Sequence, residues 1–253
     1  MVGFRNTVQV LGAKYTFSGT AAVSNLGEDP NWTGHEFSAA NTYGYGRLAW
    51  DPTLSAEDVT REWVEMTWSP VDESASDAFV ALLLGSWEAF ENYTAPLGVG
   101  FICSGDHYEP DLPHRETYTN ATNTRVGYNR EAYARTYNSP VSEHYQSLES
   151  TPNNLLLCFH NVAYTHKLDD AHGGLTVLEW IYSSHKAGAA TAAQYVTTWQ
   201  SLKGRIDTEV YGKNAYDQVL QRLQFGASEA ERFSKIVVDY FANLTGVPPT
   251  NQQ

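Results

Sequence analysis

The apolar residues of this chain recur mainly with the period of an α-helix, most clearly in its second half. They predict helices at 55–68, 75–93, from 152 onward, 174–186, 189–205, 208–225 and 228–245. Ser55 with Asp58 and Ser228 with Glu231 have the spacing of capping boxes, and Gly246 ends the last helix. The pattern indicates a mainly helical fold.

Two of these helices place apolar residues on one face. Helix 55–68 places three apolar residues on one face, namely Val59, Trp63 and Met66. Helix 75–93 places six of them there, namely Ala78, Phe79, Leu82, Leu83, Trp87 and Phe90. The stripe of helix 75–93 is broad, so we expect this helix to be well buried.

Two regions depart from the helical period. Residues 7–24 are rich in β-branched residues and glycine, which predicts a strand or extended chain. Residues 96–140 are rich in Pro, Gly, Asn and Tyr, which predicts a long irregular loop. Loops of this length in compact domains are often functional. The expected fold class is therefore mainly α, with a short β or extended N-terminal segment and a long irregular loop region.

Length and charge limit the classes of protein to consider. The 253 residues suffice for one large domain or two small ones. A formal net charge of −13 excludes nucleic acid and anionic membrane surfaces as partners, and no stretch has the about 20 apolar residues of a membrane span. Aromatic residues reach 13%, which suits either a core or a groove that faces sugars.

The cysteines and the glycosylation sequons do not decide whether the protein is secreted. Cys103 and Cys158 lie in apolar segments, which favours buried thiols over a single disulfide without excluding the disulfide. The first residues lack the apolar core of a secretory signal. Against this, Asn-x-Thr sequons permit glycosylation in a secreted protein, at Asn31, Asn92, Asn120 and Asn243.

Motifs of common enzyme classes are absent from the sequence. There is no HExxH, GxSxG, paired CxxC, P-loop or GxGxxG, and the histidines have no metal-ligand spacing, so we expect no cofactor and no metal. Adjacent acids could serve glycoside hydrolysis, at Glu28/Asp29, Glu109/Asp111 and Asp169/Asp170. All lie in turn-rich segments, where acids are mostly solvated, so no catalytic residue is assigned.

Two loops, DPNWTGH and SGDHYEP, combine a planar ring with polar groups. The apolar face of a pyranose stacks on Trp or Tyr, here Trp32 and Tyr108, and its hydroxyls need polar partners such as Asn31, His35 and His107. The loops are thus candidate carbohydrate contacts. The alternative is that both rings only pack their loops against the domain.

Several blocks in order resemble the C-terminal part of the α-glucuronidases of glycoside hydrolase family 67, with the fungal members most similar. They are DPNWTGH, YGYGRLAWDPTLSAEDVTREWV, ENYTAPLGVGFICSGDHYEP, LLLCFHNVAYTHKL and TWQSLKGRID, within about residues 21–247. Asp106 departs from the HHYGP that other members often have in the third block.

The resemblance implies a helical C-terminal domain that packs on a catalytic (β/α)₈ barrel. Family members remove glucuronic acid or its 4-O-methyl ether from xylan fragments with inversion, using carboxylates upstream of everything matched here. Residues 1–24 would then be a remnant or a replacement of the last barrel strand, and residues 25–253 the helical domain. Trp32 would lie at the barrel mouth. Arg47 is a candidate partner for a uronate carboxylate, although a structural ion pair is the favoured alternative.

Three hypotheses follow for the chain. The first is a C-terminal α-glucuronidase domain, extracellular by family expectation, that supports the barrel mouth and dimerisation and is not catalytic alone. The second is a stand-alone module that binds glucuronoxylan. The third is an assembly module whose partner is a separate catalytic barrel or a second copy, through the apolar face that a barrel would cover.

Overall fold

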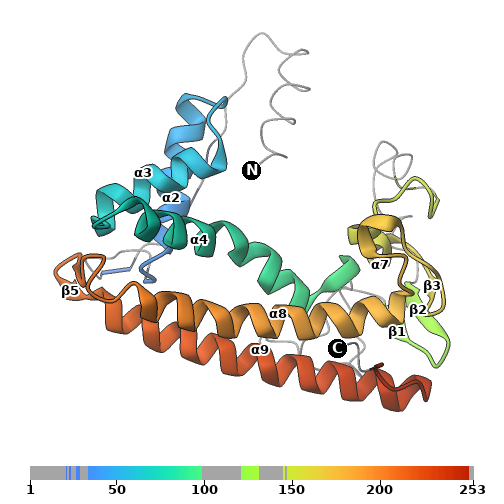
Figure 1. Ribbon diagram of the computed structural model, residues 1–253. Helices are drawn as coiled ribbons and strands as arrows, with labels where there is room; N and C mark the ends of the chain where they lie inside the picture. The colour runs from blue at the N-terminus through green and yellow to red at the C-terminus, as the bar shows by residue number, and fades with distance from the viewer. Residues whose placement is uncertain are drawn as a thin grey trace, which may run out of the picture. The chain divides into compact units, whose positions relative to one another are not determined.

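The computed structural model describes Ala21, Val23, residues 27–28, 34–98, 121–130, Tyr145 and residues 147–250. It is mainly helical, which confirms the expected fold class (Figure 1). The elements are α2 (Ser38–Trp50), α3 (Ala56–Trp68), α4 (Glu73–Thr94), η1 (Pro96–Gly98), β1 (Ala121–Asn123), β2 (Gly127–Arg130), η2 (Asn153–Leu155), α7 (Leu156–Phe159), β3 (Val162–Ala163), η3 (Asp170–His172), α8 (Val177–Ser201), β4 (Glu209–Val210), β5 (Lys213–Asn214) and α9 (Ala215–Thr245).

The chain forms two compact units, each with its own core. Unit 1 comprises Met1–Ser86 and Tyr195–Gln224, and unit 2 comprises Trp87–Gln194 and Phe225–Gln253. Helices α4, α8 and α9 each contribute residues to both units.

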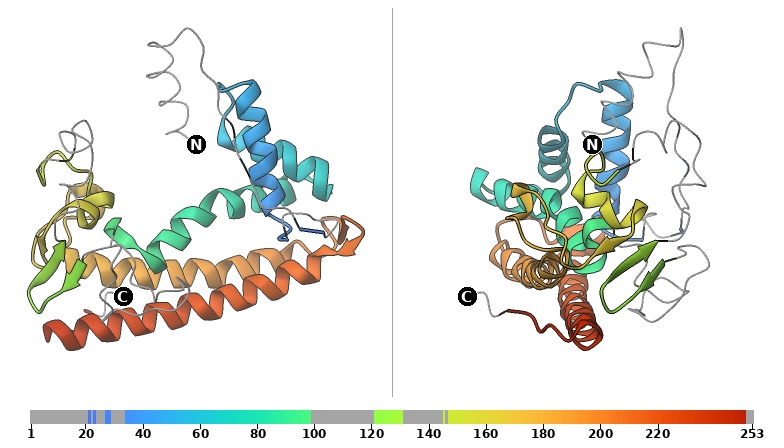
Figure 2. Two further views of the ribbon diagram at one scale, coloured as in Figure 1. Left: turned by 180° about the vertical axis from the view of Figure 1, so that it is seen from behind. Right: turned by 90° about the vertical axis from the view of Figure 1, so that its right-hand side faces the viewer.

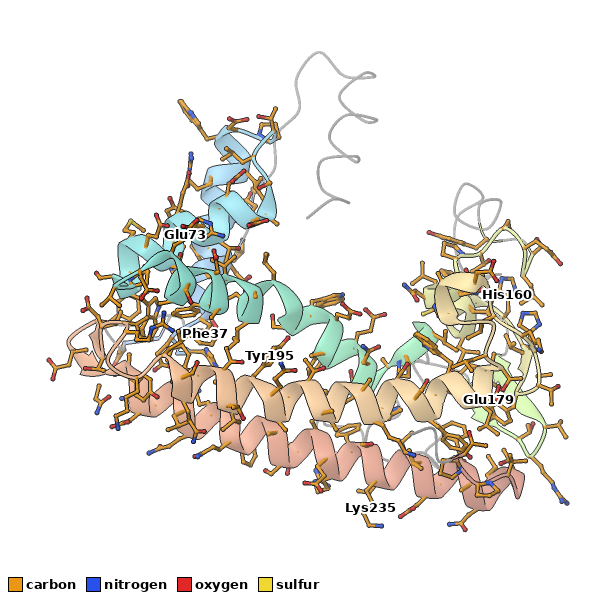
Figure 3. All side chains as sticks on the ribbon, viewed as in Figure 1. Phe37, Glu73, His160, Glu179, Tyr195 and Lys235 are labelled. Carbon is orange, nitrogen blue, oxygen red and sulfur yellow. The ribbon has the colours of Figure 1, made fainter. Side chains whose placement is uncertain are left out.

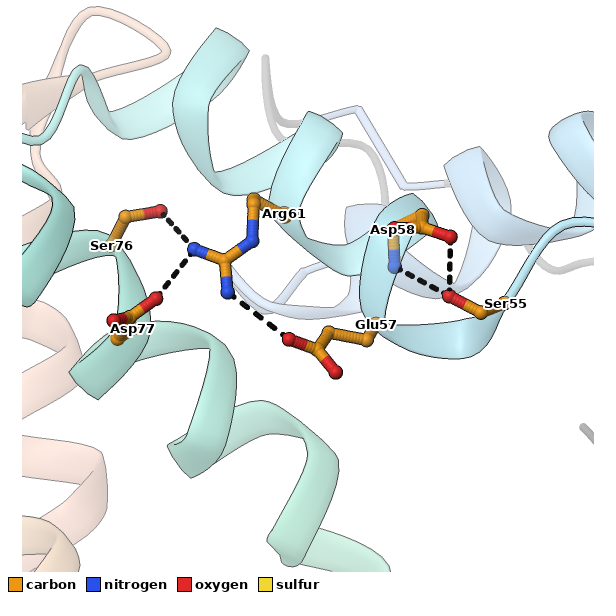
Figure 4. A network of polar contacts seen from close by, with 6 residues as sticks. All are labelled: Ser55, Glu57, Asp58, Arg61, Ser76 and Asp77. Atoms are coloured by element: carbon orange, nitrogen blue, oxygen red, sulfur yellow. Dashed lines mark hydrogen bonds and ion pairs between the residues drawn. The ribbon is translucent and has the colours of Figure 1, made fainter.

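The junction of α3 and α4 follows its sequence signals. Ser55 caps α3, because its Oγ accepts a hydrogen bond of 3.0 Å from the Asp58 amide, as the capping-box spacing predicts (Figure 4). Arg61 of α3 pairs with Asp77 of α4 at 2.7 Å and with Glu57 at 3.2 Å. The start of α3 is thereby tied to the start of α4.

The core of unit 1 is a group of aromatic rings around Trp199, which is fully buried. Its ring centroid lies 5.0 Å from that of Phe79, 5.4 Å from that of Trp68 and 5.4 Å from that of Tyr216. Its indole N–H donates to the Tyr216 carbonyl at 3.0 Å. This group joins the end of α8 to the start of α9.

A hairpin of β4 and β5 precedes α9, where the sequence predicts a helix from 208. Tyr211 and Gly212 both have positive φ, at 57° and 71°, as the two central residues of a type I′ turn require. The helix begins only at Ala215, after Asn214 accepts a hydrogen bond of 3.1 Å from the Asp217 amide. The predicted helix start at residue 208 is therefore wrong, because the hairpin occupies the residues before Ala215.

Unit 2 contains a small antiparallel sheet in the order β1-β2-β3, of which β1 and β2 are the green strands of Figure 2. Gly127 pairs with Ala163, and a Cβ on this glycine would lie 2.6 Å from the Val162 carbonyl oxygen, so only glycine fits there. Part of the predicted loop 96–140 is therefore regular, as η1 and as β1 with β2. The predicted extended segment 7–24 lies mostly outside the described residues.

Several predicted helix boundaries are wrong. Residues 174–186 and 189–205 belong mainly to the single helix α8, and Ser228 lies inside α9, where its hydroxyl donates to the Phe225 carbonyl at 2.7 Å instead of capping. The helix expected from 152 is reduced to η2 and α7, and Val162 lies in β3. Helix α2, with two glycines and no side-chain cap, was not predicted.

Two side chains of α4 that were expected inside are exposed. Trp87 is 71% exposed and Phe90 53%, whereas Phe79 and Leu82 are buried as predicted. On the apolar face of α3, Val59 and Trp63 are buried and Met66 is 64% exposed. Among the described residues, the apolar faces of α3 and α4 are therefore only partly covered. The uncovered part is available to a partner.

Replacement of two helical glycines by alanine should change the free energy of unfolding in opposite directions. At Gly188 of α8 a Cβ would lie 2.6 Å from the backbone nitrogen of Tyr93 in α4, whereas at Gly226 of α9 it would meet nothing within 4 Å. We expect Gly188→Ala to lower the free energy of unfolding by about 1–3 kcal/mol, since packed backbone must move. Gly226→Ala should raise it by about 0.5–1 kcal/mol. Urea unfolding of both variants tests this, and a stabilised Gly188→Ala would contradict it.

Candidate functional site

Only two of the six predicted sugar-contacting residues can be placed. Asn31, Trp32, His107 and Tyr108 lie outside the described residues, as do Asp29, Glu109 and Asp111 of the acid pairs. His35 and Arg47 are described, both in unit 1. The contact of the two loops with a sugar therefore stays a prediction.

His35 is the last residue of the NWTGH segment and lies three residues before the start of α2. Its Nδ1 accepts a hydrogen bond of 3.0 Å from the Phe37 amide, and the two rings lie 5.6 Å apart. Burial, followed by the positive charge of Arg222, lowers the pKa of His35. The imidazole is thus neutral at neutral pH, which suits a hydrogen-bonding role better than a charge-pairing one.

Arg222 of α9 contacts the residues on both sides of His35, although it lies far away in the sequence. Its Nη2 donates to the Gly34 carbonyl at 3.0 Å, and its Nε lies 3.4 Å from Oε2 of Glu36. The Glu36 side chain is only 6% exposed, so this pair holds a buried carboxylate. Nothing local in the sequence indicates the contact, because the donor and the Gly34 acceptor are 188 positions apart.

Arg47 forms an ion pair with Glu62, as expected if its role is structural and not the binding of a uronate. Its Nε and Nη2 donate to the two oxygens of Glu62 at 2.7 and 3.0 Å. The Tyr43 hydroxyl donates to the same carboxylate at 3.0 Å. The Arg47 hydrogen bond, followed by the one from Tyr43, lowers the pKa of Glu62. A uronate bound to Arg47 would have to compete with this carboxylate, and such a contact stays a prediction.

Unit 2 holds a second polar region, a cavity of about 560 Å³ next to η2. His172, beside it, has Nδ1 2.5 Å from Asp169 and Nε2 2.8 Å from Asn154. His160, labelled in Figure 3, contacts the Thr151 hydroxyl at 2.8 Å. Asp169 also caps η3 through the His172 amide, so this member of the Asp169/Asp170 pair has a structural role.

The remaining expectations concern thiols, metals and membranes. The Cys158 thiol donates to the Gly98 carbonyl at 3.0 Å, and Cys103 lies outside the described residues. Across the described ranges, no three His, Cys, Asp or Glu residues are grouped so that they could hold a metal ion. Within the same ranges, no helix combines the length and apolar character needed to cross a membrane.

Comparison with known proteins identifies the class. The profile of the glycosyl hydrolase family 67 C-terminus matches residues 33–253, which includes the helices from α2 to α9. The chain therefore belongs to this family of C-terminal domains, as its sequence blocks indicate.

Individual relatives are fungal. The chain is 34% identical over 247 residues to "Probable alpha-glucuronidase A" of Aspergillus fumigatus, covering 93% of this chain and 28% of the relative. It is 34% identical over 245 residues to "Alpha-glucuronidase A" of Aspergillus tubingensis, covering 92% and 28%. The chain thus spans little more than a quarter of the length of these curated relatives.

Proposed function

We propose that this chain is the C-terminal domain of an extracellular α-glucuronidase that acts on glucuronoxylan oligosaccharides. In this role it docks on a catalytic barrel, supports the barrel mouth through the NWTGH loop and contributes to dimerisation. It does not hydrolyse substrate alone. The observation that carries the proposal is the match of 93% of this chain to only 28% of an α-glucuronidase.

The exposed aromatic residues of α4 in unit 2 support the docking role. Trp87 and Phe90 are three positions apart, so they lie on the same side of the helix, and they are 71% and 53% exposed. Phe90 also packs edge to face on Tyr93, with ring centroids 5.3 Å apart. Contiguous exposed aromatic residues typically mark a protein interface. We assign this aromatic pair to contact with the barrel.

Docking can be tested with a separately produced barrel. The N-terminal portion of the Aspergillus tubingensis relative, ending where the match begins, is mixed with this chain and analysed by size-exclusion chromatography with light scattering. We expect a complex whose mass also reports dimerisation. The double variant Trp87→Ser/Phe90→Ser should weaken it at least tenfold, because two interface aromatics are typically worth more than about 1.4 kcal/mol.

A matched control is Phe225→Ser, which removes another exposed aromatic of unit 2, 69% exposed on α9. This variant should bind the barrel as the unaltered chain does. Equal weakening by Phe225→Ser would contradict the assignment of the α4 pair. Self-association of the chain through Trp87 and Phe90, without barrel binding, would instead assign the surface to a second copy.

Catalysis is tested with a xylo-oligosaccharide that carries 4-O-methylglucuronic acid. The chain alone should release no uronic acid, and addition of the barrel portion should restore release. Uronic acid released by the purified chain alone would overturn the proposal. Glu28/Asp29 and Glu109/Asp111 would then be the first candidate acids, in segments that the structure describes only at Glu28.

A further inference from the structure

Unit 2 contains a cavity of about 710 Å³, within the size range of small-molecule sites. Its walls come from the β1–β2 turn, β3 and the residues after it, the start of α8 and the chain that follows α9. The Tyr182 hydroxyl donates to the Val247 carbonyl at 2.8 Å, so the segment after α9 is tied to α8 at the cavity wall. The cavity is thus formed by several segments, two of which are held together by this hydrogen bond.

The floor and the rim of this cavity differ in character. Three tyrosines line it and are 3%, 3% and 5% exposed, namely Tyr128, Tyr164 and Tyr182. The exposed lining residues other than Arg125 are of two kinds, polar or small ones and two valines, namely Asn161, Ala163, Thr165, Pro248 and Thr250, and Val126 and Val247. Buried tyrosines beneath a rim that carries both aliphatic and hydroxyl or amide groups suit a ring with apolar faces and peripheral hydroxyls.

The charged groups of the lining are Arg125 and Glu179. Arg125 is exposed in the β1–β2 turn, and its guanidinium makes no hydrogen bond or ion pair within the residues that the structure describes. Glu179, labelled in Figure 3, already accepts from the Thr176 amide at 2.8 Å and from the Thr176 hydroxyl at 2.7 Å. In a chain of net charge −13, this cavity therefore offers a cation that no described residue neutralises.

We infer that this cavity binds a xylo-oligosaccharide that carries a uronic acid, with Arg125 paired to the carboxylate and the sugar rings over the tyrosine floor. A guanidinium is well suited to a planar carboxylate, which it can bind through two hydrogen bonds. The choice of substrate class rests on the proposed function, whereas the existence of a site rests on the cavity itself.

Isothermal titration calorimetry of the full chain tests this binding. The ligands are a xylotriose that carries one 4-O-methylglucuronic acid and the unbranched xylotriose. We expect binding of the acidic ligand, at least tenfold weaker binding of the neutral one, and a similar loss for Arg125→Ala, since each change removes the charge-assisted hydrogen bonds between guanidinium and carboxylate. Thr165→Trp, which fills the cavity from an exposed position, should abolish binding.

Two control variants show whether the ligand binds in this cavity or elsewhere on the chain. Lys186→Ala removes an exposed cation of α8 that does not line the cavity, and it should leave the affinity unchanged. Trp32→Ala should also leave it unchanged, because the inferred site does not include the NWTGH loop. Absence of binding, equal binding of the neutral ligand, or loss of binding in Trp32→Ala but not in Thr165→Trp would each overturn the inference. Barrel docking through α4 is measured separately and is unaffected by these outcomes.

Discussion

Replacement of Trp199 by alanine is expected to lower the free energy of unfolding by about 3–5 kcal/mol, the range for removal of a large buried aromatic residue. The side chain is fully buried at the centre of the unit 1 core. Its removal leaves a cavity among Trp68, Phe79 and Tyr216 and leaves the Tyr216 carbonyl without its 3.0 Å hydrogen bond. Urea unfolding followed by circular dichroism measures the loss.

Two further variants show whether the loss is due to packing. Trp199→Phe retains a ring, so it should cost clearly less than the alanine change while still losing the hydrogen bond to Tyr216. Trp87→Ala removes a tryptophan that is 71% exposed and should change stability by no more than about 0.5 kcal/mol. Equal costs for Trp199→Ala and Trp87→Ala would contradict the central place of Trp199 in the core.

The sequence predicts this fold best where local signals and burial agree. Ser55 caps α3, Gly246 ends α9 with a φ of 75°, and Phe79 is buried as the apolar stripe requires. Each of these features depends on residues within one or two helical turns. Such features can be inferred without knowledge of the rest of the fold.

The errors arise where distant contacts decide the structure. The sequence predicts two helices, 174–186 and 189–205, where the structure has the continuous helix α8, and the close approach of Tyr93 in α4 requires a small residue at Gly188. Trp87 and Phe90 continue the apolar stripe of α4, yet the chain leaves both exposed. Sequence periodicity reports that a face is apolar, but it cannot report whether the same chain covers it.

In the candidate site, too, the sequence indicates residues with local signals and gives no indication of contacts between distant segments. The residue types of Trp32 and the neighbouring loop residues suggest sugar contacts, which stay a prediction. Arg222, which anchors Gly34 and Glu36, was not identified, because a single arginine within a helix has many structural roles. The sequence does not indicate a binding role for Arg125 either, because that role depends on the cavity that the residue lines. A site formed by residues that are far apart in the sequence can be identified only from the folded structure.

His185 of α8 should make the stability of the protein depend on pH. The side chain is completely buried in unit 2, and neither ring nitrogen has a hydrogen-bond partner among the described residues. Burial lowers its pKa from 6.5 to about 3; the backbone of Tyr93 opposes this shift but does not form a hydrogen bond of ordinary geometry. The folded state therefore holds a neutral imidazole.

Below pH 6.5 the unfolded chain binds a proton at this histidine that the folded chain does not bind, down to about pH 3. Acidification over this range must therefore favour unfolding, by about 1.4 kcal/mol per pH unit once the unfolded histidine is mostly protonated. Above pH 6.5 the contribution is constant. From pH 7.5 to pH 5 we expect His185 to account for a loss of about 2 kcal/mol.

His185→Leu removes both the proton site and the two unpaired nitrogens with little change in volume. This variant should be at least as stable as the unaltered chain at pH 7.5, and it should lose about 2 kcal/mol less on acidification to pH 5. Ser184→Ala removes a neighbouring buried hydroxyl that has no hydrogen-bond partner among the described residues, and no titratable group, so it should shift stability equally at both pH values. Urea unfolding of the three proteins at pH 5 and 7.5 measures the difference. Equal acid sensitivity of His185→Leu and the unaltered chain would mean that the imidazole is already solvated or protonated in the folded state.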